Sequence, residues 1–461
     1  MKKIYLSLML CLSFGYTSWA QISSEMENDF QEILDAVIND NGYIGVSASV
    51  KVGDTQWAGV SGISATNEDL TNNSTFGMGS ITKTITSACI LQMMEQGALQ
   101  LSDPLHFYLD TYPNIDSTIT IKQLLNHTSG IFNYTDHPDF GNIFMNPAQY
   151  YTQEDVLAAF VAEPSFVIGT KQEYSNTNYL LLGMIIETIA KQSFQDEIRA
   201  RFNPNDEYPS FDMPPYDMPT ESMANLWLDP TGTGNPPQDM EGLGFSLNSF
   251  FTAAHSAGAY ASTTTDLARW GYDLYAGNIL AEASMDSLFA VHPFGLFGVI
   301  DYGLGVFSAP FSCNQTGWGH NGNIIYTAAC YYIPELDLSV AVMTNDGGQL
   351  PDVGGVDGIA NELACLYQTT GTNQAQLLDD SFDISPNPSS DNFVIAYEIE
   401  TAAAVSLTVH NELGAVVATY DLGKQLVGQQ QFVLENDWPA GFYIVKMNIG
   451  EQFLSKKIIK F

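Results

Sequence analysis

Hydrophobic and polar positions alternate at both ends of the larger part of this 461-residue chain. Residues 46–52 alternate, Gly53-Asp54 is a turn signal, and the alternation resumes over 57–60. A period of two on both sides of a Gly-containing turn is typical of a β-hairpin. Residues 339–343 form a late apolar run that predicts a further strand, and residues 356–366 predict a helix after it.

Between these strands the apolar residues follow the period of a helix. In residues 80–96 they recur three and four positions apart, at Ile81, Ile85, Ala88, Cys89 and Met93. Gly97 then supplies a left-handed C-terminal cap, and Asp103-Pro104 supports the end of this helix. Residues 179–190 predict a second apolar helix. Strands at both ends with helices between them indicate an α+β unit whose sheet is closed by the two ends of the domain.

The C-terminal part of the chain has a different pattern. Short alternating runs such as 405–409 and 442–445 are separated by Asn and Gly residues, which predicts a small all-β sandwich. The segment before it, 367–380, is polar and without periodicity, so we interpret it as a linker. The predicted organisation is therefore an α+β domain over 21–366 and a sandwich over 381–461.

One region of the larger domain departs from regular patterns. Residues 204–237 hold eight of the chain's 20 prolines, and no Lys or Arg occurs between Arg201 and Arg269. A long irregular segment inside a compact domain is usually a lid or a binding loop. We therefore expect this insert to border a binding cleft.

Charge excludes two classes of partner. The chain has 15 Lys and Arg against 52 Asp and Glu, a net charge of −37. This charge repels phosphate backbones and anionic lipid, so neither nucleic-acid binding nor membrane-surface binding is expected. Residues 21–375 contain 41 acidic and 8 basic residues, and residues 376–461 contain 11 and 5. Most of the negative charge lies on the larger domain, which favours neutral esters over anionic substrates.

Residues 1–20 have the features of a secretory signal peptide. Lys2 and Lys3 precede an apolar run over 4–14, and the exit Ser18-Trp19-Ala20 predicts cleavage after Ala20. The apolar run is too short to span a membrane, and no later segment approaches about 18 uninterrupted apolar residues. We expect an exported protein without stable membrane insertion.

Too few cysteines follow the signal peptide to make a disulfide-based scaffold. They are Cys89, Cys313, Cys330 and Cys365. A disulfide between Cys313 and Cys330, on neighbouring strands, is one candidate, but the sequence leaves the pairing open.

The scarcity of lysines directs attention to Lys83. It follows Ser80 by three positions at the start of a predicted helix, so both side chains lie on one helix face and the amine reaches the hydroxyl. Burial lowers the pKa of a lysine enough for it to take a serine proton, and a helix N-terminus offers N–H groups to developing negative charge. A Ser-x-x-Lys also arises by chance as a helix cap with an exposed lysine. The motif alone leaves both interpretations open.

If Ser80 attacks the carbonyl of a substrate, a second polar group must protonate the leaving group, and a third must orient the carbonyl. Tyr174 and Asn176 supply both functions, since a tyrosine whose pKa is lowered by a lysine shuttles protons and an amide holds a carbonyl. Tyr112-Pro113-Asn114 has the same pattern. Its proline indicates an ordinary turn, whereas Tyr174 closely precedes a long apolar helix, so we favour Tyr174.

The third element is the segment Gly319-His320-Asn321-Gly322-Asn323, just before a predicted strand over 324–333. Glycine lets a backbone approach a ligand closely, and the free N–H of an edge strand joins the Ser80 N–H in an oxyanion hole. By itself this segment is also compatible with a turn.

Together these motifs closely resemble the serine β-lactamase-related family, which includes class C β-lactamases, D-alanyl-D-alanine carboxypeptidases, D-aminopeptidases and lipase-like esterases. The resemblance extends over about residues 43–365. The resembling stretches are Phe76 to Thr84, Gln96 to Leu99 running to Asp103-Pro104, Ile119 to Gly130, Tyr174 to Asn176 with Tyr179 to Gly183, and Ser262-Thr263 with Asp266 to Arg269.

The resemblance implies an α+β fold with an antiparallel sheet, flanking helices and a helical lobe. It also implies an acyl-enzyme on Ser80, with Lys83 and Tyr174 sharing the proton transfers and with neither metal nor cofactor. The residues implied in substrate binding are Asn176, His320, Asn321 and Gly322. The N–H groups of Ser80 and Asn323 form the implied oxyanion hole, and His127 has the implied role of bracing a loop.

One departure from the family pattern weakens a β-lactamase assignment. Where these β-lactamases usually carry Lys-Thr-Gly, this chain has His320-Asn321-Gly322. An ammonium that recognises a substrate carboxylate is thereby replaced by an imidazole, which titrates near neutrality. We expect an exported serine hydrolase acting on an ester or a D-amino-acid amide. The alternatives are a D-alanyl-D-alanine carboxypeptidase or weak β-lactamase, and a catalytically inactive secreted binding protein on the same scaffold.

The C-terminal part carries a second set of motifs, over 384–389, 411–414, 440–443 and 456–461. They resemble a type IX secretion C-terminal sorting domain. This resemblance implies passage through the outer membrane by the type IX secretion machinery, by way of the periplasm, to the cell surface or the medium. The alternative is a small carbohydrate-binding sandwich, but Trp438 is the only tryptophan in this domain.

Overall fold

The structure is a computed structural model of the whole chain. It describes residues 22–231, 233, 235–293, 295–296, 301–347, 355–380, 382–390, 392–399, 402–411, 416–435, 437–450 and 452–461. The predicted signal peptide lies outside the described residues. Beyond it the chain divides into two compact units, with the division after Gln368.

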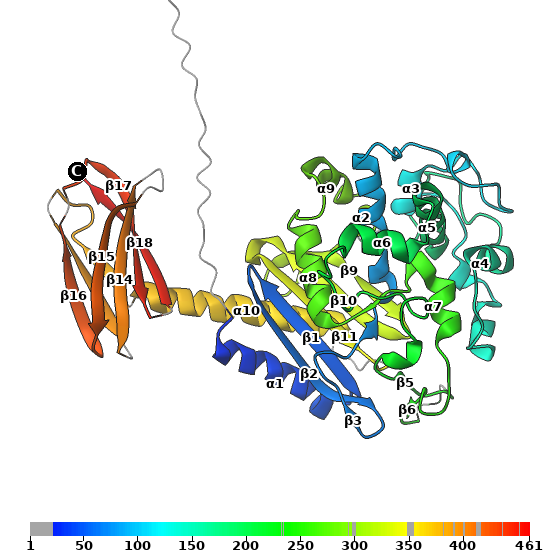
Figure 1. Cartoon of the computed structure of the whole chain (residues 1–461), viewed down its shortest axis with the longest axis horizontal. Coiled ribbons are helices and arrows are strands. Elements are labelled where there is room, and N and C mark those ends of the chain that lie inside the picture. Colours follow the sequence, from blue (N-terminus) through cyan, green and yellow to red (C-terminus); the bar gives the residue numbers. More distant parts are fainter. Residues whose placement is uncertain are drawn as a thin grey trace, which may run out of the picture. The chain divides into compact units, whose positions relative to one another are not determined.

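A seven-stranded sheet forms the centre of the first unit, in the order β3-β2-β1-β11-β10-β9-β8 (Figure 1). Its strands are β1 (Gly45–Val52), β2 (Thr55–Ala65), β3 (Glu68–Asp69), β8 (Phe307–Phe311), β9 (Gln315–Ile324), β10 (Tyr326–Ile333) and β11 (Leu338–Thr344). Neighbouring strands are antiparallel, and β1 pairs with β11 from Val46 opposite Thr344 to Val52 opposite Leu338. The two ends of the domain therefore close the sheet, as the sequence pattern predicts.

Helices cover both faces of this sheet. On one face, side chains such as Val50 and Val342 pack with α1 (Ser24–Asn41) and with the first part of α10 (Gly355–Asp380). On the other face, residues such as Met343 belong to a larger core built with α8, α2 and α5. These helices are α8 (Thr264–Tyr275), α2 (Thr82–Glu95) and α5 (Asn176–Ala190). β1 and β11 are buried along almost their whole length because both of their faces are covered.

The remaining helices form a lobe with α2 and α5 (Figure 1). They are α3 (Ile121–Leu125), α4 (Gln153–Phe160), α6 (Phe194–Phe202), α7 (Asn248–Ala254) and α9 (Glu282–Leu288). Residues 82–91 of α2 are all buried, so its polar side chains need internal partners. Thr86 Oγ1, for example, donates to the carbonyl of Ser256 at 2.7 Å. Gly97 follows the helix with a φ of 72°, as predicted for its cap.

Short pairs of strands complete this unit. They are β4 (Phe76–Gly77) with β7 (Ala261–Ser262), and β5 (Trp227–Leu228) with β6 (Gln238–Asp239). Part of the proline-rich insert, 204–237, is packed, since Tyr208, Phe211 and Met213 are buried in the main core. The rings of Tyr208 and Phe211 stack with centroids 5.1 Å apart.

Cysteine pairing differs from the candidate bridge between Cys313 and Cys330. Cys313 forms a disulfide with Cys365 of α10, with Cα atoms 5.3 Å apart, and Cys330 is a buried free thiol. The physical reason is where the two cysteines lie: Cys313 is in the turn between β8 and β9, and Cys330 is on β10. Cys330 faces α8, where its Sγ lies 3.5 Å from the carbonyl of Leu267, while Cys313 packs on the face covered by α1 and α10.

The segment 367–380, interpreted from its pattern as an irregular linker, is the last part of α10. Its polar sequence shows no apolar period, but the helix has already formed over the buried residues before it. Extending an existing helix adds a hydrogen bond per residue without a new nucleation cost. This part of the helix therefore needs no apolar face to form.

The second unit contains two packed antiparallel sheets, which confirms the predicted small sandwich. One has the order β12-β13-β16 and the other β15-β14-β17-β18. Their strands are β12 (Phe382–Ser385), β13 (Phe393–Ile399), β14 (Ala403–Asn411), β15 (Val416–Gln425), β16 (Gly428–Leu434), β17 (Gly441–Ile449) and β18 (Gln452–Lys460). Phe393, Leu407 and Val445 lie in the core between them. Residues 412–414 of the second motif in this unit lie outside the described residues.

No helix in the described parts of the chain combines the length and the apolar character needed to cross a membrane.

Candidate active site

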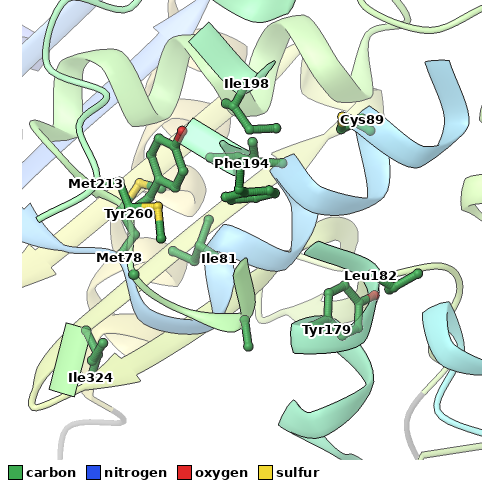
Figure 2. Packing of buried hydrophobic residues seen from close by; sticks show 14 of the residues in the cluster. Met78, Ile81, Cys89, Tyr179, Leu182, Phe194, Ile198, Met213, Tyr260 and Ile324 are labelled. Carbon is green, nitrogen blue, oxygen red and sulfur yellow. The ribbon is translucent and has the colours of Figure 1, made fainter. Parts of the chain in front are cut away.

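Ser80 lies on a tight turn at the start of α2. It is the middle residue of the 3-10 turn η1 (Gly79–Ile81), which continues directly into the helix. Met78 and Ile81 on either side are buried in the hydrophobic core shown in Figure 2. Gly79 has a φ of 54°, a conformation that favours glycine. The turn therefore leaves the Ser80 hydroxyl accessible while its neighbours anchor the backbone.

Lys83 lies one helical turn after Ser80 and is fully buried. Its Nζ is 3.0 Å from Ser80 Oγ, 2.7 Å from Asn176 Oδ1 and 2.6 Å from the carbonyl oxygen of Ala257. The last two oxygens only accept, so each takes an N–H. A neutral amine has two N–H groups and one lone pair, which leaves the lone pair for the serine hydroxyl. Burial lowers the pKa of Lys83 well below its usual value, which favours the neutral amine.

Tyr174 lies beside this pair, with its ring centroid 4.9 Å from Lys83 Nζ. Its hydroxyl is buried and makes no hydrogen bond of ordinary length and angle with a described residue. Burial raises the pKa of Tyr174, although the nearby Ser80 opposes part of the rise. The expectation of a pKa lowered by the lysine is therefore wrong, because burial disfavours the phenolate and favours an uncharged lysine. The geometry makes Tyr174 a hydroxyl donor.

Asn176 is the first residue of α5, and its position is held by both backbone and side chain. Its N–H donates to Asn133 Oδ1 at 2.9 Å, and its Nδ2 donates to Thr135 Oγ1 at 3.3 Å. The competing motif lies elsewhere, since Asn114 Nδ2 donates to the carbonyl of Val161. The structure therefore brings Tyr174 and Asn176, rather than the 112–114 motif, to Ser80.

The segment 319–323 belongs to β9 itself rather than preceding a strand, and a turn at Ile325 connects β9 to β10. Because neighbouring side chains of a strand point to opposite faces, His320 and Asn321 separate. His320 lies on the face towards Tyr174, with ring centroids 6.2 Å apart. Asn321 Nδ2 donates to Asp357 of α10 at 3.1 Å. The Asn321 side chain therefore lies on the opposite face of the sheet from His320.

Behind Tyr174, the Tyr302 hydroxyl connects His127 and His320 in a chain of hydrogen bonds. Each group in the chain donates towards His320. His320 Nδ1 bonds the carbonyl of Asn321, so it carries the proton, and Nε2 accepts from Tyr302 OH at 3.2 Å. His127 Nδ1 accepts the N–H of Ser175 at 3.2 Å, so its Nε2 carries the proton and donates to Tyr302 OH at 3.2 Å. Every group is satisfied with both imidazoles neutral. His127 also braces the segment that contains Tyr174, in agreement with its implied role.

Burial keeps both imidazoles neutral. It lowers the pKa of His320 to about 3, with a smaller contribution from Lys83, and it lowers the pKa of His127 well below the usual value. His320 is only 3% exposed. The expectation that His320 titrates near neutrality is wrong, because its protonated form would be buried beside Lys83 with both ring nitrogens already hydrogen-bonded.

We expect the free energy of unfolding to decrease as the pH falls below about 6.5. In the unfolded chain these histidines protonate near that pH, whereas in the folded chain their lowered pKa values keep them neutral. Stability is therefore complete above pH 6.5 and is lost at about 1.4 kcal/mol per pH unit for each histidine. Denaturant titrations between pH 7.5 and 5.5 measure this slope. His320→Gln should reduce this slope by the contribution of one histidine. An unchanged slope would contradict a neutral His320 in the folded protein.

Two glycines allow β9 to approach the Ser80 turn. A Cβ on Gly322 would lie 1.9 Å from the carbonyl oxygen of Met78 and 2.9 Å from the backbone nitrogen of Ser80. A Cβ on Gly79 would lie 2.5 Å from the backbone nitrogen of Asn323. β8 pairs with β9 only from Gln315 to Gly319, so the end of β9 near Ser80 is an edge. The backbone nitrogens of Ser80 and Asn323 are thereby brought to the same corner.

A cavity of about 220 Å³ opens beside Ser80. Its described lining residues are Ser80, Tyr134, Thr135, Phe140, Ile143, Phe144, Asn176, Phe250, Ala254, Ala257, Gly258, Asn323, Ile324 and Ile325. None of them comes from the proline-rich insert, which was expected to border the cleft. The walls come instead from η4 (Phe140–Met145), from α7 and from the end of β9.

Sequence analysis missed three parts of this site. The Ala257 carbonyl is a backbone group and leaves no side-chain signal. Tyr302 lies far from every motif in the sequence. Two phenylalanines of the cavity wall, Phe140 and Phe144, lie in a short 3-10 turn that shows no apolar period.

Residues 27–362 match the Beta-lactamase family, and residues 383–461 match the Secretion system C-terminal sorting domain. Penicillin-binding protein 4* of Bacillus subtilis (strain 168) is 27% identical over 248 residues, which are 51% of this chain and 52% of the relative. The chain thus spans about half the length of this curated relative.

The match to solved structures of the same fold extends over nearly the whole length of those structures. A D-stereospecific amidohydrolase from Streptomyces sp. has a TM-score of 0.63 and 26% identity, covering 74% of this chain and 98% of that chain. The D-amino acid amidase from Ochrobactrum anthropi SV3, complexed with L-phenylalanine amide, has a TM-score of 0.63 and 21% identity, covering 76% and 99%. At that identity the second likeness shows the fold alone. The family match spans most of the sequence and the structural likeness covers most of the chain, so this chain belongs to the beta-lactamase family and ends in a secretion system C-terminal sorting domain.

Proposed function

We propose that this chain is an exported serine hydrolase that forms an acyl-enzyme on Ser80 and hydrolyses an ester or a D-amino-acid amide. One observation carries the proposal: Lys83 Nζ lies 3.0 Å from Ser80 Oγ while Asn176 and the Ala257 carbonyl occupy its two N–H groups. An amine held in this way accepts the serine proton as the hydroxyl attacks.

The proton transfers follow from the positions of the side chains. Ser80 Oγ forms a bond with the substrate carbonyl carbon while its proton passes to Lys83 Nζ. As the tetrahedral intermediate collapses, the Tyr174 hydroxyl donates its proton to the leaving group and is reprotonated from Lys83. Water then attacks the acyl-Ser80 ester while its proton passes to Lys83 Nζ. The bond between Ser80 Oγ and the acyl carbon breaks, the acid product leaves, and Lys83 returns the proton to Ser80 Oγ. The unpaired, buried Tyr174 hydroxyl supports this role, because such a donor is costly unless a substrate atom accepts from it.

The negative charge that develops on the substrate oxygen needs donors at a fixed place. We assign this function to the backbone N–H groups of Ser80 and Asn323. The close approach of Gly322 to Met78 and Ser80 supports the assignment, because it fixes the distance between the backbone of β9 and the backbone of the Ser80 turn. Asn176, whose Nδ2 faces the cavity wall at Thr135, is assigned to the acyl side of the substrate. His320 acts from behind, as part of the support for Tyr174.

Gly322→Ala is expected to lower kcat for ester hydrolysis by roughly 10²- to 10³-fold, the usual effect of losing one oxyanion donor. The new Cβ would overlap the carbonyl oxygen of Met78, and neither backbone yields without moving Asn323 away from Ser80. Steady-state kinetics and a thermal unfolding curve measure activity and folding together. Gly141→Ala is the matched control, because a Cβ there meets no atom within 4 Å. Equal activity of Gly322→Ala and wild type would disprove the assigned oxyanion hole.

The names of the relatives suggest two types of substrate. One relative is a penicillin-binding protein and another is a D-stereospecific amidohydrolase. A D-alanyl-D-alanine carboxypeptidase or a weak β-lactamase therefore stays as the second candidate. Against it, His320 is neutral at the place where a lysine would bind a substrate carboxylate. A panel of short-chain esters, D-alanine dipeptides, D-amino-acid amides and a chromogenic cephalosporin, tested on the purified protein, separates these candidates.

Covalent labelling tests the proposal against a catalytically inactive binding protein. A fluorophosphonate probe should label Ser80, identified by mass spectrometry of the labelled peptide. No labelling, or labelling that persists in Ser80→Ala, would refute the proposal. Export by the type IX secretion machinery is the remaining part of the proposal, and it rests on the sorting domain over 383–461 together with the predicted signal peptide.

A further inference from the structure

The cavity beside Ser80 is apolar and uncharged. Its walls are formed mainly by large hydrophobic side chains, which are Phe140, Ile143, Phe144, Phe250, Ile324 and Ile325. The polar groups that line it, from Ser80, Tyr134, Thr135, Asn176 and Asn323, are all uncharged. Among its described lining residues there is no Asp, Glu, Lys, Arg or His. A charged group of a substrate would therefore have no opposite charge to pair with inside the cavity.

Several cations of this unit serve other contacts. Lys83 is fully buried and its N–H groups are occupied. Arg199 pairs with Asp217 at 2.7 Å, and Lys171 pairs with Glu173 at 2.8 Å. None of the eight Lys and Arg residues of the region 21–375 lines the cavity.

The residues next to the cavity wall add negative charge. Asp136 follows the lining residue Thr135, and Asp139 precedes Phe140, and both carboxylates are exposed. A substrate carboxylate that entered would lose its hydration and find no cation among the lining residues. Burial of an unpaired charge in such a place is strongly unfavourable.

The hydrophobic wall is held in place by contacts between η4 and α7. The rings of Phe144 and Phe250 meet edge to face, with centroids 4.5 Å apart and planes inclined by 73°. Ser249 ties the two segments together, with its N–H donating to Pro147 and its Oγ donating to Ile143, at 2.9 and 3.1 Å. Phe250 is 7% exposed and Phe144 is 46% exposed. Phe250 therefore forms the inner wall, and Phe144 lies at the mouth.

We propose, on the basis of the function assigned above, that the acyl group accepted beside Ser80 is uncharged and apolar, and that Phe144 and Phe250 select it. Aromatic acyl groups fit this wall, because edge-to-face contacts with phenylalanine add to the burial of apolar area. Acyl groups that carry a carboxylate are excluded by the absence of a paired cation. The substrate class is a neutral ester with an aromatic or similarly bulky apolar acyl group.

A matched pair of substrates tests the proposal. The 4-nitrophenyl esters of 4-methylphenylacetic acid and 4-carboxyphenylacetic acid differ only in a methyl group replaced by a carboxylate. We expect kcat/KM for the methyl compound to exceed that for the carboxylate by at least about 100-fold. It should also exceed kcat/KM for 4-nitrophenyl acetate. Equal values for the two arylacetates, or an arylacetate no better than acetate, would overturn the proposal.

Variants test the residues that we assign to selection. Phe250→Ala and Phe144→Ala should each lower the ratio of arylacetate to acetate kcat/KM by about 10-fold or more. Met145→Ala is the matched control: Met145 neighbours Phe144, is 77% exposed and does not line the cavity, so the ratio should stay unchanged. Phe144→Arg should shift the preference towards the carboxylate substrate, because it places a cation at the mouth. An unchanged ratio in both alanine variants would disprove their role.

Two results separate this proposal from the assigned function. If acetate is hydrolysed and fluorophosphonate labels Ser80, but the two arylacetates do not differ, only the selectivity proposal fails. If no ester is hydrolysed and Ser80 is not labelled, the assigned function fails with it.

Discussion

Replacing Ser80 with alanine is expected to reduce ester turnover by about 10³- to 10⁶-fold, the range seen when a covalent nucleophile is removed. In the proposed mechanism this hydroxyl bonds to the substrate carbonyl carbon, and no other described hydroxyl has a hydrogen bond to Lys83 Nζ. The measurement is kcat/KM with a neutral nitrophenyl ester, compared with the rate in buffer alone.

The fold should survive this change, so a loss of activity reports on chemistry. The turn that contains Ser80 is anchored by the buried Met78 and Ile81, and alanine keeps the backbone and Cβ. Thermal unfolding of Ser80→Ala should match the wild type. Ser222→Ala, at an exposed position, is the control and should keep full activity. Turnover above a tenth of the wild-type value in Ser80→Ala would show that another residue is the nucleophile.

Lys83→Met is expected to lower turnover by roughly 10²- to 10⁴-fold, the usual contribution of a positioned general base. Methionine has a similar length but no amine, so the Ser80 proton has no acceptor. Lys83→Arg should not restore activity, because a guanidinium stays protonated and has no lone pair for the hydroxyl. Kinetics with the same ester and a circular dichroism spectrum measure activity and folding.

The pH dependence of the wild-type enzyme gives an independent test of Lys83. Burial lowers its pKa well below the usual value, so the amine is neutral and basic over a range in which an exposed lysine is charged. Activity should therefore persist as the pH decreases below the ordinary lysine pKa, and should be lost only when the pH passes below the lowered value. An acid limb at the ordinary lysine pKa would contradict a neutral Lys83. His320 and His127 face Lys83 from behind Tyr174, and both stay neutral across this range.

Local spacing made the contact between Ser80 and Lys83 predictable. Ser80 and Lys83 are three residues apart on a helix, so their contact follows from helix geometry alone. The same holds for Gly97 as a cap and for the alternating strands of both units. The choice of Tyr174 over Tyr112 also followed from local context, because only Tyr174 is followed by a long apolar helix.

Strand register limited what the sequence could establish at β9. The segment 319–323 was placed before a strand rather than within it, so the alternation of His320 and Asn321 was not recognised. Strand pairing is a property of the folded sheet. The disulfide depended on helix packing instead, since α10 brings Cys365 to Cys313 in the turn between β8 and β9, while Cys330 faces α8.

By itself the sequence determined the α+β architecture, the sandwich, the Ser-x-x-Lys pair and the scarcity of cations, because each depends on residues close in the chain or on composition. Only the tertiary structure decided the direction of the pKa shifts, the Ala257 carbonyl that orients Lys83, and the phenylalanine wall. These depend on burial and on contacts between segments far apart, such as Lys83 with Ala257 and Phe144 with Phe250. The pKa of a side chain depends on its burial and on the charges near it. For these residues the folded structure, and not the order of the sequence, determines both.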